Sequence, residues 1–166
     1  PVIQIQSASV QALYFNCGNE LTVNVPALGS EYNPTFSATG GDVVRGSKAG
    51  VVTIIPKSKK VNLNVSNAGN FIGSQSFGVR QIPGPEIKAR IKGKEIDAKS
   101  GIPVSTPSFS LDAIADASFA EFLPKDARFQ VREAEINLVR AGRGVSRQRV
   151  NSKNVNLNKL AGKRKG

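Results

Sequence analysis

The sequence predicts an all-β protein built from two small immunoglobulin-like β-sandwich domains in tandem, the second with one short helix. Many short segments alternate apolar and polar residues, which is typical of strands with one buried face. The composition supports this class, because 16 Gly and 9 Pro favour frequent turns. A chain of 166 residues with 39% hydrophobic and 21% charged residues can bury two modest cores.

The first domain is predicted to contain seven short strands. In the segment 61–66, three apolar residues alternate with Asn62, Asn64 and Ser66, so one face of this strand is buried and the other is wet. The segment 51–55 is apolar at both parities and is therefore expected at the centre of a sheet. Turn-rich stretches such as Gly40-Gly41-Asp42 and 67–70 separate the segments. The expected strands are 2–6, 10–16, 20–25, 35–38, 51–55, 61–66 and 76–82.

A domain boundary is expected at Pro83-Gly84-Pro85. The two prolines fix φ and remove backbone donors, so a central strand cannot pass through this stretch. Gly84 alone keeps soft torsions between them. The first domain is therefore assigned to residues 1–83 and the second to 84–166, with Pro83, Gly84 and Pro85 as a semi-rigid interdomain hinge.

The second domain is predicted to begin with a strand at 87–92 whose outer face is basic. Residues 99–110 are expected to form a loop, and apolar residues at three- and four-residue steps predict a helix over 111–123 with Ser110 as its N-cap. After Phe129 and Val131 the apolar residues of the alternating pattern shift from odd to even positions. This shift predicts an extended segment with a β-bulge near Arg132-Glu133. A last strand is expected at 154–158.

The composition excludes most catalytic chemistry. The chain has no His, which rules out the usual general base, Ser-His-Asp and Cys-His arrangements and His-bearing zinc sites. Its single Cys17 lies on the apolar face of an alternating strand, and we interpret it as a core residue. Glu133 and Glu135 share a strand face about 6.6 Å apart, a spacing that glycosidases use, but nothing marks a cleft around them. We expect no catalytic residue, no metal and no cofactor.

Charge gives the one functional signal in the composition. Residues 1–83 carry 6 basic and 3 acidic side chains, whereas residues 84–166 carry 17 and 9, and from Arg140 onward nine basic residues occur without an acidic one. Such a face binds nucleic acid, an anionic membrane or an acidic protein, or is simply solvated. Nucleic acid is the weaker choice, because 140–166 contains no aromatic residue to stack on bases. The candidate partner-binding residues are Arg140, Arg143, Arg147, Arg149, Lys163, Arg164 and Lys165.

Two stretches carry recognisable motifs: a strand-turn-strand pattern with Tyr14, Asn19, Leu21, Val23, Val25 and Pro26, and the stretch 77–85 with its two prolines. Together they resemble the GldM/PorM family, the periplasmic shaft proteins of the type IX secretion and gliding motor. The first is a strand-turn-strand signature, in which Asn16 and Ala27 stand where the family usually has glycine. The second, residues 77–85, looks like the family's Val-Arg-x-Ile-Pro-x-Pro junction between its last two domains. The similarity spans the whole chain.

The resemblance implies a non-catalytic, force-transmitting component. It implies a periplasmic homodimer, anchored in the inner membrane by an N-terminal helix that this chain lacks. Its expected partners are an inner-membrane motor and the ring subunits associated with the outer membrane, with no nucleic acid and no small-molecule substrate. Because the family usually continues past 162–166 with another strand, the last domain is expected to be incomplete. The alternatives are a secreted immunoglobulin-like adhesion module and, less favoured, a basic nucleic-acid-binding protein.

Overall fold

The computed structural model describes residues 1–6, 12–97 and 99–158. The chain divides into two compact units. The first unit is Pro1–Pro83 together with Ser118–Asp126, and the second unit is Gly84–Ala117 together with Ala127–Gly166. No helix among the described residues is both long and apolar enough to cross a membrane.

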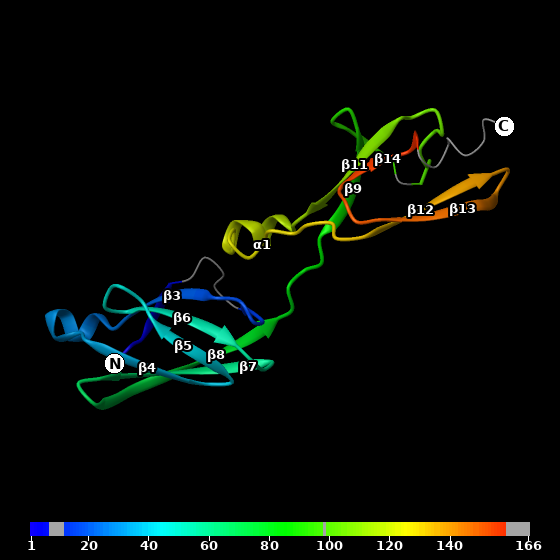
Figure 1. Ribbon diagram of the computed structural model, residues 1–166. Coiled ribbons are helices and arrows are strands. Elements are labelled where there is room, and N and C mark those ends of the chain that lie inside the picture. Colours follow the sequence, from blue (N-terminus) through cyan, green and yellow to red (C-terminus); the bar gives the residue numbers. More distant parts are fainter. Residues whose placement is uncertain (7–11, 98, 159–166) are drawn as a thin grey trace. The chain divides into compact units, whose positions relative to one another are not determined.

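The first unit contains two four-stranded sheets (Figure 1). One sheet has the strand order β1-β3-β6-β5 and the other has the order β2-β8-β7-β4. All neighbouring strands are antiparallel except β2 and β8, which run parallel. The strands are β1 (Gln4–Gln6), β2 (Ala12–Tyr14), β3 (Asn19–Asn24), β4 (Pro34–Thr39), β5 (Gly41–Arg45), β6 (Val51–Pro56), β7 (Lys60–Asn67) and β8 (Asn70–Arg80).

The core of the first unit is made by the faces that the alternation predicts. In β7 the apolar residues are buried while Asn62 is exposed, because successive side chains of a strand point to opposite faces. β6 lies between β3 and β5, as its apolar character at both parities indicates. The buried cluster consists of Leu13, Leu21, Val23, Val52, Ile54, Val61, Leu63, Val65 and Phe77.

One part of the first unit differs from the sequence expectation. The sequence predicts a turn over Gly40-Gly41-Asp42. In the structure the turn is confined to Gly40, and β5 begins at Gly41. Gly40 has φ of 85°, and a Cβ placed on it would lie 2.2 Å from the backbone oxygen of Lys60, so only glycine fits this turn. After Pro26 the chain forms a short 3₁₀ segment, η1 (Pro26–Glu31).

The second unit contains one four-stranded sheet and a separate hairpin (Figure 1). The sheet has the order β10-β9-β11-β14, and the hairpin pairs β12 with β13. Its core is small and centres on Phe109, Val155 and Leu157, with half-buried residues such as Leu111 and Ile136 packed against them. The strands are β9 (Glu86–Ile91), β10 (Lys94–Ile96), β11 (Ser108–Ile114), β12 (Ala134–Arg140), β13 (Arg143–Val150) and β14 (Asn154–Asn156).

The helix expected over 111–123 is wrong in its first half. Residues from Ser108 to Ile114 form strand β11, and the helix α1 covers only Ala117–Phe122, so Ser110 caps nothing. β11 lies between β9 and β14, with Leu111 opposite Ala89 and Phe109 opposite Val155. The three-residue spacing of Leu111 and Ile114 fits a helix, but pairing with these two distant strands overrides this local pattern and makes the segment a strand.

The bulge expected near Arg132-Glu133 is also wrong. Residues 129–133 are not in a strand, and β12 starts at Ala134. The shift of the apolar residues from odd to even positions is therefore explained by an irregular stretch before the strand. A register shift does occur in the hairpin, between Leu138 and Val139.

Candidate partner-binding surfaces

The tip of the β12–β13 hairpin carries two of the candidate arginines. Arg140 and Arg143 are opposite each other in the register and flank the two-residue turn Ala141-Gly142. Both turn residues have positive φ, 50° and 76°, as a tight hairpin turn requires. Like charges directly opposite each other repel. No salt bridge to either arginine occurs within the described residues, so the tip presents unneutralised positive charge.

The other two candidate arginines are paired with carboxylates of the neighbouring strand segment. Arg147 Nε lies 3.3 Å from Glu135 Oε1, and Arg149 Nη1 lies 3.7 Å from Glu133 Oε1. The expectation of an uncompensated basic run is therefore wrong for Arg147 and Arg149. The same ion pairs give Glu133 and Glu135 a structural role. Lys163, Arg164 and Lys165 lie outside the described residues.

The basic face predicted for β9 is also largely neutralised. Lys88 Nζ lies 3.1 Å from Glu95 Oε2, across the β9–β10 turn. Arg90 Nη1 lies 3.6 Å from Asp112 Oδ2 on β11. Because these pairs sit on adjacent strands, the positive charge of this sheet is balanced locally. The hairpin tip is thus the stronger candidate for an electrostatic contact.

The segment Ser118–Asp126, which we call the clasp, lies in the first unit although both of its flanks lie in the second. Phe119 of α1 is fully buried, and its ring meets the ring of Tyr14 edge-on with centroids 4.8 Å apart. Phe122 lies 5.9 Å from the same ring, and Leu123 is also buried. Such aromatic pairs add about 0.5–1.5 kcal/mol beyond area burial. The hinge residues 83–85 are therefore one of three places where the chain passes between the units.

Tyr14 is held by a buried turn that Asn19 closes. The Tyr14 N–H donates to Asn19 Oδ1 at 2.8 Å, and Asn19 Nδ2 donates to the carbonyls of Tyr14, Cys17 and Ile54 at 3.0, 2.8 and 3.2 Å. Asn16, at the apex, has φ of 57°, a conformation that Asn tolerates better than most residues. The apex of the turn therefore accepts Asn without needing glycine.

Cys17 is buried at the same turn, which confirms its interpretation as a core residue. Burial raises the pKa of the Cys17 thiol, and the nearby carboxylate of Asp126 raises it further. A raised pKa keeps the thiol protonated and a poor nucleophile. The Asp126 carboxylate belongs to the clasp, so the reactivity of Cys17 reports whether the clasp is in place.

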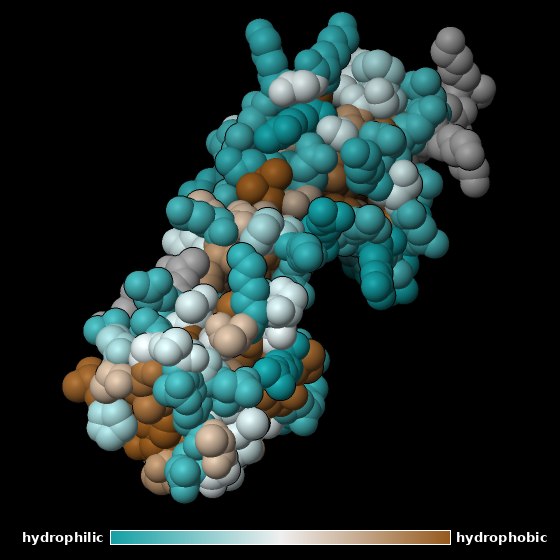
Figure 2. Space-filling model, turned by 90° about the vertical axis from the view of Figure 1, so that its left-hand side faces the viewer, coloured by the Kyte–Doolittle hydropathy of each residue, from teal (hydrophilic) through white to brown (hydrophobic). Residues whose placement is uncertain are grey.

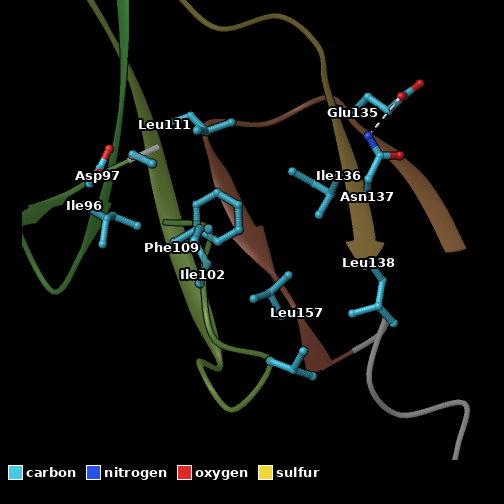
Figure 3. Close-up of a pocket in the computed structure, with 13 residues that line it drawn as sticks. Ile96, Asp97, Ile102, Phe109, Leu111, Glu135, Ile136, Asn137, Leu138 and Leu157 are labelled. Carbon is cyan, nitrogen blue, oxygen red and sulfur yellow. Dashed lines mark hydrogen bonds between the residues drawn. The ribbon is translucent and has the colours of Figure 1, made fainter. Parts of the chain in front are cut away.

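A pocket of about 350 Å³ opens in the second unit (Figure 3). Its floor is the apolar face of the sheet, with Ala89, Phe109 and Leu111. One wall is β12, from Glu135 to Leu138. In Figure 3, Ile136 points into the pocket and the side chain of Asn137 points away from it. The lining is mainly apolar, which suits a hydrophobic side chain rather than a charged ligand.

The surface chemistry differs between the units on the face drawn in Figure 2. There the second unit is largely hydrophilic, and apolar side chains gather on the first unit. Within the described residues, no group of three or more Asp, Glu or Cys side chains is placed to hold a metal ion.

Sequence reasoning missed the clasp and the pocket. The apolar spacing of Phe119, Phe122 and Leu123 indicated that one helix face is buried, but not against which sheet. The sequence did single out Tyr14, the ring partner of Phe119, because Tyr14 belongs to the strand-turn-strand signature. The pocket left no sequence signal, because its floor and wall come from strands that alternate like all the others.

Comparison with known families gives two matches that together span nearly the whole chain. The GldM third domain matches residues 2–80, and the GldM C-terminal domain matches residues 83–164. The gap between the two matches, residues 81–82, lies just before the Pro83-Gly84 break between the units. No curated protein matches the chain.

Proposed function

The chain belongs to the GldM family, components of the gliding and type IX secretion motor, and we propose that it transmits force within that motor. In this proposal it is a non-catalytic periplasmic part of a homodimer. In the same proposal, the protein connects the inner-membrane motor to ring subunits under the outer membrane.

The observation that carries the proposal is the triple passage of the chain between its two units. A single flexible linker would let two domains swivel and would dissipate torque. Here Pro83-Gly84-Pro85 is stiffened by two prolines, and the clasp adds two further covalent connections. The clasp is held by the buried Phe119 against Tyr14. A load passing along the chain is therefore shared by three connections.

The proposed docking site for the ring is the hairpin tip, Arg140 and Arg143. The planar guanidinium fork binds a carboxylate with two hydrogen bonds, so an acidic protein surface is the matching partner. A partner carboxylate placed between the two arginines would also relieve their mutual repulsion. Arg147 and Arg149 contribute less, because each is tied to a glutamate.

The force-transmission proposal is tested in cells with two changes that leave both sheets intact. Replacing 83–85 by three glycines softens the hinge, and Phe119→Ala loosens the clasp. We expect each variant to accumulate normally, with reduced secretion and gliding, and the combination to be more severe. The control is Phe71→Ala, which removes an aromatic ring that is 67% exposed. Normal secretion from the combined variant would show that stiffness between the units does not matter.

The docking proposal is tested separately, with purified ring subunits. Arg140→Glu combined with Arg143→Glu is expected to weaken binding about tenfold at low salt and to flatten its salt dependence. The matched control reverses Arg45 and Arg80, two exposed arginines of the first unit. If the tip variant binds as tightly as the unchanged protein at low salt, the ring contacts another surface.

A further inference from the structure

Strand β12 has an open edge. It pairs with β13 on one side, and no other described strand pairs with it. A two-stranded hairpin is marginally stable alone, and an unpaired edge offers a row of N–H and C=O groups to another strand. Proteins commonly cover such an edge with charge, a bulge or a neighbouring element. The edge of β12 borders the pocket of the second unit.

The residues that line the pocket show how β12 meets it. Four consecutive residues, Glu135 to Leu138, line the wall, although their side chains alternate between two faces. Because successive side chains point to opposite faces of a strand, consecutive residues can line the same cavity only where the cavity lies along the backbone edge. The floor contributes one parity, since Ala89 and Leu111 are directly opposite each other on β9 and β11. The pocket is therefore the space beside β12 and above a sheet face (Figure 3).

Charge on the hairpin decides which segment fits this space. The face of β12 that points away from the pocket continues the acidic row begun by Glu133 and carries Glu135, whereas the matching face of β13 carries Arg147 and Arg149. Each acidic side chain already pairs with an arginine on one side. A strand added at the open edge would place its outward side chains on the other side of the glutamates, where opposite charge across strands is favourable.

We propose that the open edge of β12 and the adjoining pocket bind an extended segment of a partner protein by strand addition. The segment carries apolar residues at every second position, which enter the pocket over Phe109 and Leu111, and Lys or Arg between them, beside Glu133 and Glu135. The backbone of the segment supplies the hydrogen bonds and the pocket supplies the choice of side chain. This site is distinct from the arginine tip, which selects acidic partners.

The test uses the full chain and fluorescent peptides seven residues long, to match β12. One peptide alternates Val with Lys and the other alternates Val with Glu. We expect the lysine peptide to bind at least about tenfold more tightly, since two or three cross-strand charge pairs reverse sign between them. Equal binding, tighter binding of the glutamate peptide, or binding of neither would overturn the proposal.

Backbone methylation tests the strand geometry without changing the protein. A strand donates through the N–H groups of every second residue on each edge, so methylating one parity blocks one edge only. We expect N-methylation of one parity to abolish binding and of the other parity to leave it nearly unchanged. Equal effects of both parities would mean that the peptide does not bind as a strand.

Variants then locate the site. Ala89→Leu fills the pocket floor and Glu135→Lys reverses the cross-strand charge. Each substitution should weaken binding of the lysine peptide at least about tenfold. Glu20→Lys, on an exposed position of β3, is the matched control and should leave binding unchanged.

A chain ending at Asn158 is compared as well. If only the shortened chain binds, the chain's own end occupies the pocket, and if Ala89→Leu abolishes self-association, a second copy does. Either result overturns the proposal.

Discussion

Asn19 is the residue whose loss the structure predicts to be most costly for the first unit. It is fully buried, and its side-chain amide makes four hydrogen bonds to backbone groups of Tyr14, Cys17 and Ile54. Asn19→Ala leaves the buried Tyr14 N–H without this acceptor, which costs about 1–3 kcal/mol, and removes bonds to carbonyls worth about 0.5–1.5 kcal/mol each. The expected loss is about 3–4 kcal/mol, with a fall in Tm of about 12–32 °C for a domain of this size.

The measurement is urea unfolding followed by tyrosine fluorescence. The chain has no Trp, and its two tyrosines, Tyr14 and Tyr32, both lie in the first unit, so this signal reports that unit alone. Asn62→Ala, an exposed asparagine on β7, is the matched control and should cost less than about 0.5 kcal/mol. A loss below about 1 kcal/mol for Asn19→Ala would refute the argument that this amide closes the turn.

A second substitution at the same position separates the hydrogen bonds from the shape of the side chain. Asn19→Asp keeps the acceptor for the Tyr14 N–H but faces three carbonyls with an oxygen instead of a donor. When protonated, the carboxyl group regains one donor, so burial and these carbonyls should raise its pKa in the folded state. The stability of the variant should therefore be highest at low pH and fall as the pH rises through the ordinary range of Asp, about 4. A stability that rises over this range would contradict the assignment.

Three further predictions concern the first unit. Phe119→Ala should release the clasp and speed the reaction of Cys17 with a thiol reagent at least about tenfold, whereas Phe71→Ala should not; an unchanged rate would mean that the clasp does not cover the thiol. Ala68 occupies a hairpin turn with φ of 48°, so Ala68→Asn should raise the free energy of unfolding by about 0.5–1 kcal/mol in urea titrations, and a loss would contradict the strain at this turn. Burial raises the pKa of Cys17 and of Tyr32 above their ordinary values of 9.0 and 10.0, so the folded state holds protons that the unfolded chain releases. The free energy of unfolding should therefore fall as the pH rises through 9 and 10. The Cys17→Ala variant should lose less stability over this pH range than the unchanged protein.

Much of the fold could be predicted because strand alternation is a local property. The alternation in β3 and β7 places Leu21 and Leu63 in the core without any knowledge of their partners, since neighbouring side chains of a strand must point to opposite faces. The positive-φ conformation of Asn16 is local in the same sense. The family resemblance rested on these local features, and the two matched domains confirm it.

The candidate site depended on contacts between residues far apart in the chain. The arginines of β13 could be counted from the sequence, but their neutralisation by Glu133 and Glu135 required the register of the hairpin. Leu111 could not be assigned to a strand until β9 and β14 lay on either side of it.

The sequence by itself determined which residues are apolar, where the chain turns and which strand faces are buried, because these follow from backbone geometry over a few residues. Only the tertiary structure decided that Phe119 packs on Tyr14, that two of the arginines are paired and that, among the described strands, only β13 pairs with β12. The free energy of such contacts depends on the distance and burial of groups that the chain order leaves far apart, so no local pattern encodes it.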